Sequence, residues 1–308
     1  MPTTGAKGSL TLADLAGKDY GDASWEKLLD QMSIEDMTTL INTGGWQTAA
    51  IESVGKMATS DCDGPSGLSN YVTGSNGTQF PTEVLMAQTW SKEMAEKIGD
   101  ALGQEFANAN NYGWYGPAMN LHRTAFLLTY MTEQTFRETC LKPFEMVVKN
   151  FDFERYVMGM MTAYNWLGTV PAISSSELLN DVLRGEWGFQ GMVISDYNGS
   201  YGFEITDAAI RAGNDFMLGY GMAESNKLED TDSATCVLAM RQACKNILYT
   251  VGNSGYYAGE GGAAEGGNKM TTMFAAVDAA VIIAALAIEA VVILRWAKKR
   301  QGSGKAGK

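Results

Sequence analysis

The chain has little of what metal, redox and serine-triad chemistry require. Its 308 residues include one histidine and four cysteines. No two cysteines have Cys-x-x-Cys spacing, so neither a zinc site nor a redox pair is predicted, and no metal or cofactor is expected. Cys236 and Cys244 would lie two turns apart on one helix, too far to bridge, and we expect the cysteines to be small buried apolar residues. No Gly-x-Ser-x-Gly motif accompanies the single histidine, His122, so we expect it to have a structural or pocket-lining role.

Positive charge is scarce outside the C-terminal end. The net charge is −12, and residues 1–272 carry 17 basic and 33 acidic residues. An acidic body repels phosphate, so nucleic acid is not an expected partner. The N-terminal residues Met1–Gly5 contain no apolar run, and no signal peptide is predicted.

The segment Trp187–Tyr197 is the most informative part of the sequence. Gly188 and Gly191 indicate a turn, and Met192–Ile194 is an apolar run typical of a strand that is buried on both faces. Upstream, Ser174 and Glu177 have capping-box spacing, which predicts a helix to about Trp187. Helix, loop, buried strand and terminal Asp196 together resemble one unit of a (β/α) barrel, whose chemistry lies at the strand C-termini. The alternative is that Asp196 merely caps the next helix.

Further elements are predicted over residues 1–257. Ser33 and Asp36 form a capping-box pair at the second of two helices, 23–32 and 33–41. Ser91 opens an amphipathic helix, and a last helix covers 232–249. The strands are predicted at 57–60, 114–120, 157–164, 192–196 and 216–220. The side chains expected to pack into the core are Met94, Ile98, Leu102 and Phe106 of the Ser91 helix, and Val237, Met240, Cys244, Ile247 and Leu248 of the last helix.

The C-terminal residues predict a membrane anchor. A flexible Gly-rich linker, 258–272, precedes a transmembrane helix, 273–297, and a basic tail, 298–308. Eleven Val, Ile, Leu or Phe residues within 274–294 favour insertion by about 3 to 7 kcal/mol, whereas a carboxylate at mid-bilayer costs about 2.5 to 3.5 kcal/mol. Asp278 and Glu289 lie nearer the ends of the span, where this cost falls. The alternative is an amphipathic helix of the barrel wall.

Several motifs, in order, resemble glycoside hydrolase family 3, the β-glucosidase family. Gly-Phe-x-Gly-x-Val-x-Ser-Asp followed by an aromatic residue, 188–197, resembles its nucleophile motif. Asp63–Gly67 resembles its sugar-binding Asp-Gly-Pro turn. The other matching segments are Leu28–Ser33, Trp114–Arg123, Glu133–Glu138 with Leu141–Glu145, and Met161–Asn165. The resemblance covers roughly residues 10–257 and implies an α/β fold of the TIM-like (β/α) barrel type.

The resemblance assigns one catalytic residue and five substrate-binding residues. It implies that Asp196 is the nucleophile of a retaining glycosidase and that Asp63 binds sugar hydroxyls. Met161 and Tyr164 would line the same subsite, with Tyr164 orienting the nucleophile. Tyr197 would replace the family's usual Trp beneath the sugar ring. Arg123, at the end of the segment that resembles the second strand, is also expected to bind substrate.

Two parts of the family pattern are missing from the sequence. Residues 121–126 run directly into 127–133, without the family's Gly-Arg-Asn-Phe-Glu and Lys-His motifs. We therefore expect an internal deletion and an incomplete barrel that lacks at least one βα unit. The acid/base Glu, which one branch of the family takes from an α/β sandwich domain that precedes the barrel, is also absent.

The sequence therefore predicts a retaining glycosidase of the β-glucosidase type that acts on β-glucosides or related oligosaccharides in carbohydrate catabolism. We expect the activity of this chain to be impaired, and a separate or missing sandwich domain to be a possible partner. The alternative is a catalytically inert, membrane-anchored remnant of the barrel that binds carbohydrate or protein. The positive-inside rule places the tail in the cytoplasm and the barrel outside it, with the bilayer as a further partner.

Overall fold

The computed structural model describes residues 1–64, 66–70, 74–117, 128–150, 159–197, 202–219 and 226–257. The chain divides into two units, Met1–Gly262 and Ala263–Lys308. The predicted linker, membrane span and basic tail lie outside the described residues. Among the described residues, no helix is both long and apolar enough to cross a bilayer.

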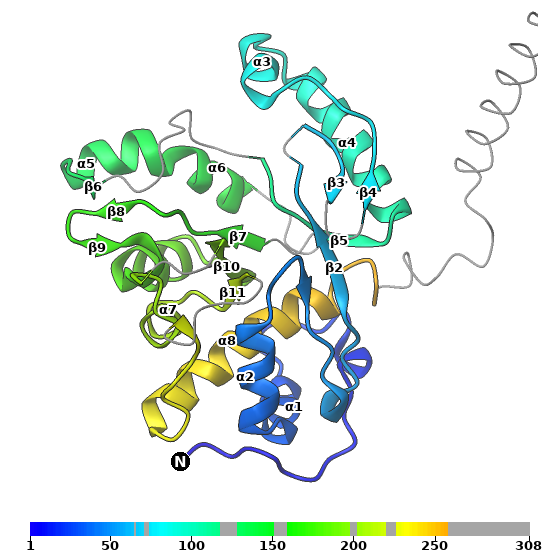
Figure 1. Cartoon of the computed structure of the whole chain (residues 1–308), viewed down its shortest axis with the longest axis vertical. Coiled ribbons are helices and arrows are strands. Elements are labelled where there is room, and N and C mark those ends of the chain that lie inside the picture. Colours follow the sequence, from blue (N-terminus) through cyan, green and yellow to red (C-terminus); the bar gives the residue numbers. More distant parts are fainter. Residues whose placement is uncertain are drawn as a thin grey trace, which may run out of the picture. The chain divides into compact units, whose positions relative to one another are not determined.

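Three three-stranded sheets contain parallel strands, and two of them are the main sheets of the fold. In the first, β2 (Thr59–Cys62) pairs antiparallel with β1 (Gln47–Thr48) and parallel with β5 (Asn111–Trp114). In the second, β10 (Met192–Tyr197) lies parallel to both β7 (Gly159–Met161) and β11 (Phe216–Leu218) (Figure 1). Among the described residues, no backbone ladder joins β5 to β7.

Smaller strands and short helical turns lie between these elements. The hairpin β3 (Ser69–Asn70)–β4 (Ser75–Asn76) follows β2. A third sheet contains β6 (Leu128–Thr129), β8 (Trp166–Leu167) and β9 (Val170–Pro171). The short turns are η1 (Leu12–Leu15), η2 (Glu52–Val54) and η4 (Ala172–Ser174).

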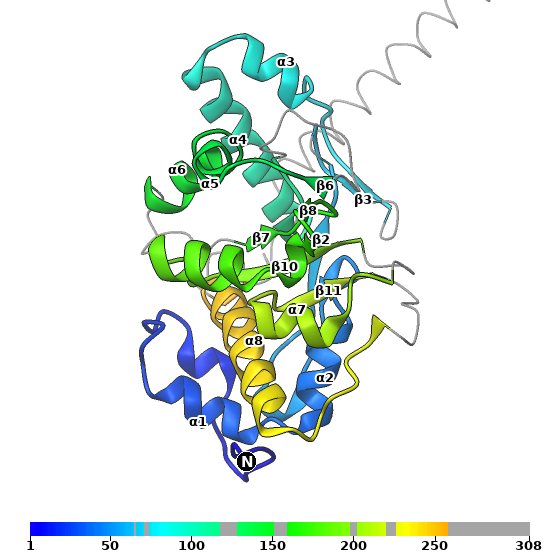
Figure 2. The same cartoon turned by 90° about the vertical axis from the view of Figure 1, so that its left-hand side faces the viewer.

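Helices pack against both main sheets. Helix α8 (Ala234–Gly252) contacts β10, and α1 (Ser24–Gln31) and α2 (Ile34–Asn42) lie beside it (Figures 1 and 2). Helix α4 (Lys92–Asn108), preceded by α3 (Glu83–Gln88), contacts β5. The remaining helical segments are α5 (Glu133–Thr135), the π-helical η3 (Phe136–Leu141), α6 (Lys142–Asn150), the π-helical η5 (Glu177–Glu186) and α7 (Thr206–Ala212).

The largest buried cluster lies between the N-terminal helices, α8 and the second sheet. Trp25, Leu28, Met37 and Met240 within it have no exposed surface, and Ile194 and Phe216 join it from the strands. Because the apolar side chains of α8 recur with helical spacing, one face of that helix can cover the sheet. This cluster fixes the strands that carry Asp196 and its neighbours.

Most of the predicted elements form, although their ends shift by a few residues. The Ser33–Asp36 capping box is confirmed, with Asp36 N–H donating to Ser33 Oγ at 3.0 Å and Ser33 N–H donating to an Asp36 oxygen at 2.9 Å. The predicted Ser174–Glu177 box is wrong. Ser174 belongs to η4, and it is Ser175 Oγ that accepts from the Leu178 N–H at 3.3 Å. The first barrel strand is β2, two residues later than expected.

Two predictions of burial are corrected. Met94 of α4 is 47% exposed, because it lies one turn short of the buried stretch that begins at Ile98. Cys140 is half-buried, whereas the other three cysteines are buried as expected, and all four are free thiols. The five α8 side chains that we expected to face the core are buried.

Candidate active site

Asp196 stands where strand β10 ends. Val193, Ile194 and Ser195 before it are at most 5% exposed, because β10 is the central strand of its sheet and packs on both faces. The pairing with β11 shifts between Ile194–Phe216 and Tyr197–Leu218: β10 advances by three residues while β11 advances by two. Such a bulge re-aims the side chains at a strand end.

Ser195 holds this bulge in place. Its hydroxyl accepts from the Leu218 N–H at 2.8 Å and donates to the carbonyl oxygen of Asp196 at 2.6 Å. One carboxylate oxygen of Asp196, Oδ1, accepts from the Tyr197 N–H at 2.7 Å. The backbone therefore fixes the direction of the Asp196 carboxyl group.

The environment of Asp196 opposes ionisation. Burial raises the pKa of Asp196 above its ordinary value, hydrogen bonds from the Tyr197 N–H and the Tyr164 hydroxyl lower it, and the charge of Asp63 raises it. Asp63 therefore lies close enough for its carboxylate to act on that of Asp196. The two acids come from different sheets, and the fold brings them together.

Asp63 follows strand β2 and opens a turn that only glycine permits. Gly64 has φ +118°, and a Cβ atom there would lie 1.7 Å from the Gly67 carbonyl oxygen. The Trp114 indole N–H donates to the Gly64 carbonyl at 3.0 Å, which ties this turn to β5. The half-buried Asp63 is thus held at the C-terminal edge of the first sheet.

The loop around residues 43–46 links the two sheets. Gly44 N–H donates to the Met217 carbonyl of β11 at 3.0 Å, and Asp61 N–H of β2 donates to the Trp46 carbonyl at 2.9 Å. The Trp46 ring, which is buried, lies 5.8 Å from the Tyr197 ring. This loop accounts for the proximity of Asp63 and Asp196.

Three of the four remaining site predictions, Met161, Tyr164 and Tyr197, concern residues around these acids. Tyr164 donates its hydroxyl to the Tyr197 carbonyl at 2.5 Å, and Tyr197 is 37% exposed. Met161 pairs with Ile194 in the sheet and packs on the large core cluster. The structure brings Asp63, Met161, Tyr164, Asp196 and Tyr197 to one region, whereas Arg123 and His122 lie outside the described residues. Their individual roles stay predictions.

Glu204 is the site residue that we did not single out from the sequence. It has no exposed surface, and burial together with the charge of Asp196 raises its pKa to about 8. The ring of the preceding Phe203 packs on Tyr164 and Trp166, at 6.5 and 5.7 Å between centroids. Glu204 lies outside any recognisable sequence motif, so only its burial beside Asp196 identifies it.

A second buried ionisable pair precedes Asp63 in the chain: Asp61 lies on β2, and Lys56 lies just before that strand. Lys56 donates to the carbonyls of Thr48, Ala49 and Met57 and to the Thr48 hydroxyl, at 2.6 to 3.3 Å. Burial lowers the pKa of Lys56 to about 7 and raises that of Asp61 to about 6. Because these bonds hold Lys56 against β1 and the charge of Lys56 acts on Asp61 of β2, the pair supports the strand that precedes Asp63.

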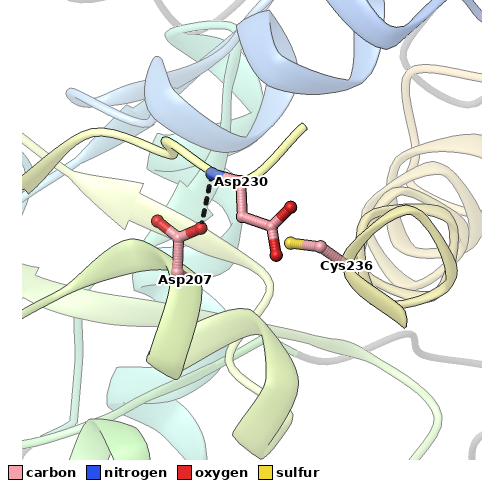
Figure 3. A group of neighbouring side chains, drawn as sticks. All are labelled: Asp207, Asp230 and Cys236. Atoms are coloured by element: carbon pink, nitrogen blue, oxygen red, sulfur yellow. Dashed lines mark hydrogen bonds between the residues drawn. The ribbon is translucent and has the colours of Figure 1, made fainter. Parts of the chain in front are cut away.

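One group of side chains has the composition of a metal site. The ligand atoms of Asp207, Asp230 and Cys236 lie within 4.8 Å of one another (Figure 3). However, Asp207 accepts from the Glu229 and Asp230 N–H groups, and Asp230 accepts from Ser233 and from Arg211. Burial also raises the pKa of Cys236 to about 11, which keeps the thiol protonated. The group is therefore better explained as the N-terminal cap of α8.

Comparison with known proteins shows which family part of the chain resembles. Residues 115–219 match the N-terminal domain of glycosyl hydrolase family 3. β-Glucosidase B of Emericella nidulans is 28% identical over 245 residues, covering 63% of this chain and 28% of that protein. A β-glucosidase of Rhizobium radiobacter is 28% identical over 243 residues, covering 62% and 29%.

Solved structures agree on the fold. A β-glucosidase from Paenibacillus barengoltzii has a TM-score of 0.68 at 23% identity, covering 84% of this chain and 36% of that one. β-Glucosidase 3B from Thermotoga neapolitana, in complex with glucose, has a TM-score of 0.61 at 21% identity, covering 76% and 43%. These neighbours give the chain an α/β, TIM-barrel-like fold.

Residues 115–219 are thus similar to the N-terminal domain of glycosyl hydrolase family 3, and the curated proteins that the chain resembles are β-glucosidases, which are O-glycosyl hydrolases. The chain spans less than a third of the length of the curated relatives named above.

Proposed function

We propose that the chain carries the nucleophile half of a retaining β-glycosidase site for β-glucosides or related oligosaccharides. The observation that supports this most directly is the Asp196 carboxyl group, fixed by a bulge at the end of the central strand and within electrostatic reach of Asp63. In barrel enzymes, chemistry lies at this edge of the sheet. Ionised Asp196 would attack the anomeric carbon and form a glycosyl-enzyme, which water then hydrolyses.

The neighbouring groups suit this chemistry. The Tyr164 hydroxyl stabilises the ionised form of Asp196, and Tyr197 offers an aromatic surface for a sugar ring. Asp63 would accept hydrogen bonds from sugar hydroxyls. Glu204 keeps its proton at neutral pH and limits negative charge around the nucleophile.

We infer that turnover by this chain alone is slow. A retaining mechanism also needs a proton donor about 5 to 5.5 Å from the nucleophile, and general acid–base assistance contributes about 10²- to 10⁴-fold. Glu204 has no exposed surface from which to reach a leaving group, and the family's acid motif is absent from the sequence. We propose that a sandwich domain supplies this group.

We further propose that at least one βα unit is deleted where residues 121–126 run into 127–133. The alignment with the Emericella enzyme extends over 245 positions, yet it covers only 63% of this 308-residue chain, so the relative has residues with no counterpart here. The absence of a ladder between β5 and β7 among the described residues is consistent with this deletion.

We also propose that residues 273–297 anchor the protein in a bilayer, with the basic tail in the cytoplasm and the barrel domain on the other side. The support is the composition of the sequence: 21 residues, 274–294, of which nineteen are apolar, followed by Lys298, Lys299 and Arg300. Protease protection of the tail in sealed vesicles tests this orientation, and digestion of the barrel domain and the tail from the same side would contradict it.

A trapping experiment tests the catalytic proposal. The full chain is incubated with 2,4-dinitrophenyl 2-deoxy-2-fluoro-β-D-glucopyranoside, whose good leaving group reduces the need for a proton donor. We expect the mass of one fluoroglucosyl group to be added and peptide mapping to place it on Asp196. Asp181→Asn, which changes an exposed acid on η5, serves as a matched control and should label normally.

Two other outcomes would reject the proposal in different ways. Labelling at another carboxyl group would reject Asp196 as the nucleophile. Glucose binding by calorimetry without any labelling would instead favour the inert carbohydrate-binding alternative.

A further inference from the structure

A short segment, residues 43–49, connects the two main sheets. At one end, the Gly44 N–H donates to the Met217 carbonyl of β11 at 3.0 Å. A Cβ atom on Gly44 would lie 2.4 Å from that carbonyl oxygen, so only glycine allows this close approach. At the other end, β1 pairs with β2. The segment therefore contacts both the sheet that carries Asp196 and the strand that precedes Asp63.

Trp46, in the middle of this segment, has a strained backbone. Its φ is +52°, in the left-handed region that residues other than glycine rarely occupy. Its side chain is buried, and its ring lies 5.8 Å from the ring of Tyr197, the residue after the candidate nucleophile. A strained conformation of this kind persists only where the surrounding contacts fix it. Other groups must therefore hold residues 43–49 in place.

The side chain of Lys56 binds this segment. It donates to the Thr48 hydroxyl at 2.8 Å, and to the carbonyls of Thr48, Ala49 and Met57 at 3.3, 2.6 and 3.0 Å. An ammonium group offers one more N–H donor than a neutral amine, so these oxygen acceptors favour the charged form of Lys56. Lys56 is 1% exposed and does not reach a substrate. An apolar side chain at this position would remove every one of these donors.

Asp61 of β2 binds the same segment from the other side of the charge pair. Its carboxylate is buried, and its charge acts on that of Lys56. Its N–H donates to the Trp46 carbonyl at 2.9 Å. The side chain of Lys56 and the backbone of Asp61 therefore both hold the segment, and Asp63 follows Asp61 by two residues.

We propose that Lys56 is a positioning residue of the glycosidase site. By binding residues 43–49, it holds the end of β2, and with it Asp63, in place relative to Asp196. This inference rests on the proposed function and deepens it, because it names a residue that sets how tightly the sugar binds. Asp196 is fixed separately by the hydrogen bonds of Ser195, so loss of Lys56 should displace Asp63 and leave the nucleophile where it is.

Double variants separate positioning from stability. Lys56→Met with Asp61→Leu replaces the two buried charges with apolar side chains, a change that often leaves stability unchanged or raises it. The urea midpoint of the full chain should therefore stay close to that of the unmodified protein. Lys56→Met alone leaves the Asp61 charge buried without the ammonium beside it and should lower the midpoint. Lys97→Met with Glu93→Leu makes matching changes in an exposed ion pair and serves as the control.

Two measurements read the effect of the buried double variant. Without ligand, hydrogen exchange should be at least about tenfold faster in peptides that cover residues 43–49, while peptides from α8 exchange as before. With the fluoroglucoside, the concentration for half-maximal labelling rate should rise about tenfold, and the limiting rate should fall less than about threefold. The reason for this split is that Asp63 binds the sugar whereas Asp196 attacks it.

A further variant tests the segment while Lys56 stays in place. Gly44→Ala introduces a Cβ atom against the Met217 carbonyl and so displaces the other end of residues 43–49. It should weaken fluoroglucoside binding in the same way as the buried double variant. Unchanged binding in Gly44→Ala would overturn the inference, because the segment would then not control Asp63.

The remaining outcomes separate this inference from the proposed function. Unchanged exchange and labelling in the buried double variant would overturn the inference, and so would exchange that is faster throughout the chain, which would assign Lys56 to stability alone. Faster exchange confined to residues 43–49, with no labelling even in the unmodified chain, would support the role of Lys56 in joining the sheets and reject the proposed function instead.

Discussion

The acids at the two ends of the β7–β10–β11 sheet have opposite electrostatic surroundings. At the strand N-termini, the Asp215 carboxylate accepts from Arg184 at 2.7 Å, from Asn246 at 2.7 Å and from the Val193 N–H at 2.6 Å. At the C-termini, Asp196 instead faces the acids Asp63 and Glu204.

This difference suggests that the acid at the N-terminal edge serves stability and that the acids at the C-terminal edge serve chemistry. Burial raises the pKa of Asp215 to about 6, but its bonds to Arg184, Asn246 and Val193 stabilise the charged form and join η5, α8 and β10, so Asp215 holds the sheet together. The acids at the other end oppose one another's ionisation, an arrangement that costs stability and is typical of reactive sites. In barrel enzymes the two ends of the strands divide these tasks in the same way.

Replacing the nucleophile should give the largest effect. Asp196→Asn removes the attacking oxygen, so the rate of labelling by the fluoroglucoside should fall by a factor on the order of 10⁴ or more. The free energy of unfolding, measured by urea denaturation, should stay the same or rise, since a buried repulsive charge is removed. If Asp196→Asn is equally inactive but markedly less stable, Asp196 has a structural role like that of Asp215.

Replacing the structural acid should act on stability alone. Asp215→Ala leaves Arg184 as an uncompensated charge, 15% exposed, so urea denaturation should show a loss of about 3 to 5 kcal/mol. Glu93→Ala breaks an ion pair with Lys97 of the same 2.7 Å length, but Glu93 is 76% exposed, and about 0.3 to 0.5 kcal/mol is expected. Similar losses in the two variants would mean that the Asp215 network is not the anchor of the sheet.

Glu204 should make stability depend on pH. Its pKa is about 8 in the folded chain against an ordinary value of 4.5. Between these values the unfolded chain has lost a proton that the folded chain retains, so this group lowers the free energy of unfolding as pH rises from 4.5 to 8. The slope is at most about 1.4 kcal/mol per pH unit, and no further loss occurs above the folded pKa.

The conservative variant isolates this contribution. Glu204→Gln cannot ionise, so urea denaturation at pH 5, 6, 7 and 8 should show a flatter profile than that of the unmodified chain. Parallel profiles for the two proteins would show that Glu204 ionises normally and would remove it from the repulsive group.

The smallest effect is expected from Tyr164. Tyr164→Phe removes a hydrogen bond that stabilises ionised Asp196, so the labelling rate should fall by up to about tenfold. The pKa of Asp196 should rise, which moves the acid limb of the pH profile of labelling to higher pH. Tyr130→Phe, at a 71% exposed tyrosine, is the control and should leave the pH profile unchanged. A slower rate with an unshifted acid limb would indicate that Tyr164 acts on packing only.

The sequence predicted local structure well and the site in part. The apolar run Met192–Ile194 and the Ser33–Asp36 spacing depend only on near neighbours, and both gave the observed elements. The Ser174–Glu177 spacing did not predict the helix start because Ser174 belongs to a separate turn. Met94 was wrongly predicted to be buried because helical periodicity shows which face of α4 is apolar, but not how much of that face other elements cover. Such errors arise where tertiary contacts decide between local alternatives.

The sequence by itself therefore determined the strands, the helices and the acid that ends β10, because periodicity and capping are local properties. Only the tertiary structure decided that Asp63 acts on Asp196, that Glu204 is buried beside them, and that Lys56 binds the segment between the two sheets. The physical reason is that burial and electrostatic coupling depend on segments far apart in the chain, and no local pattern encodes their distance.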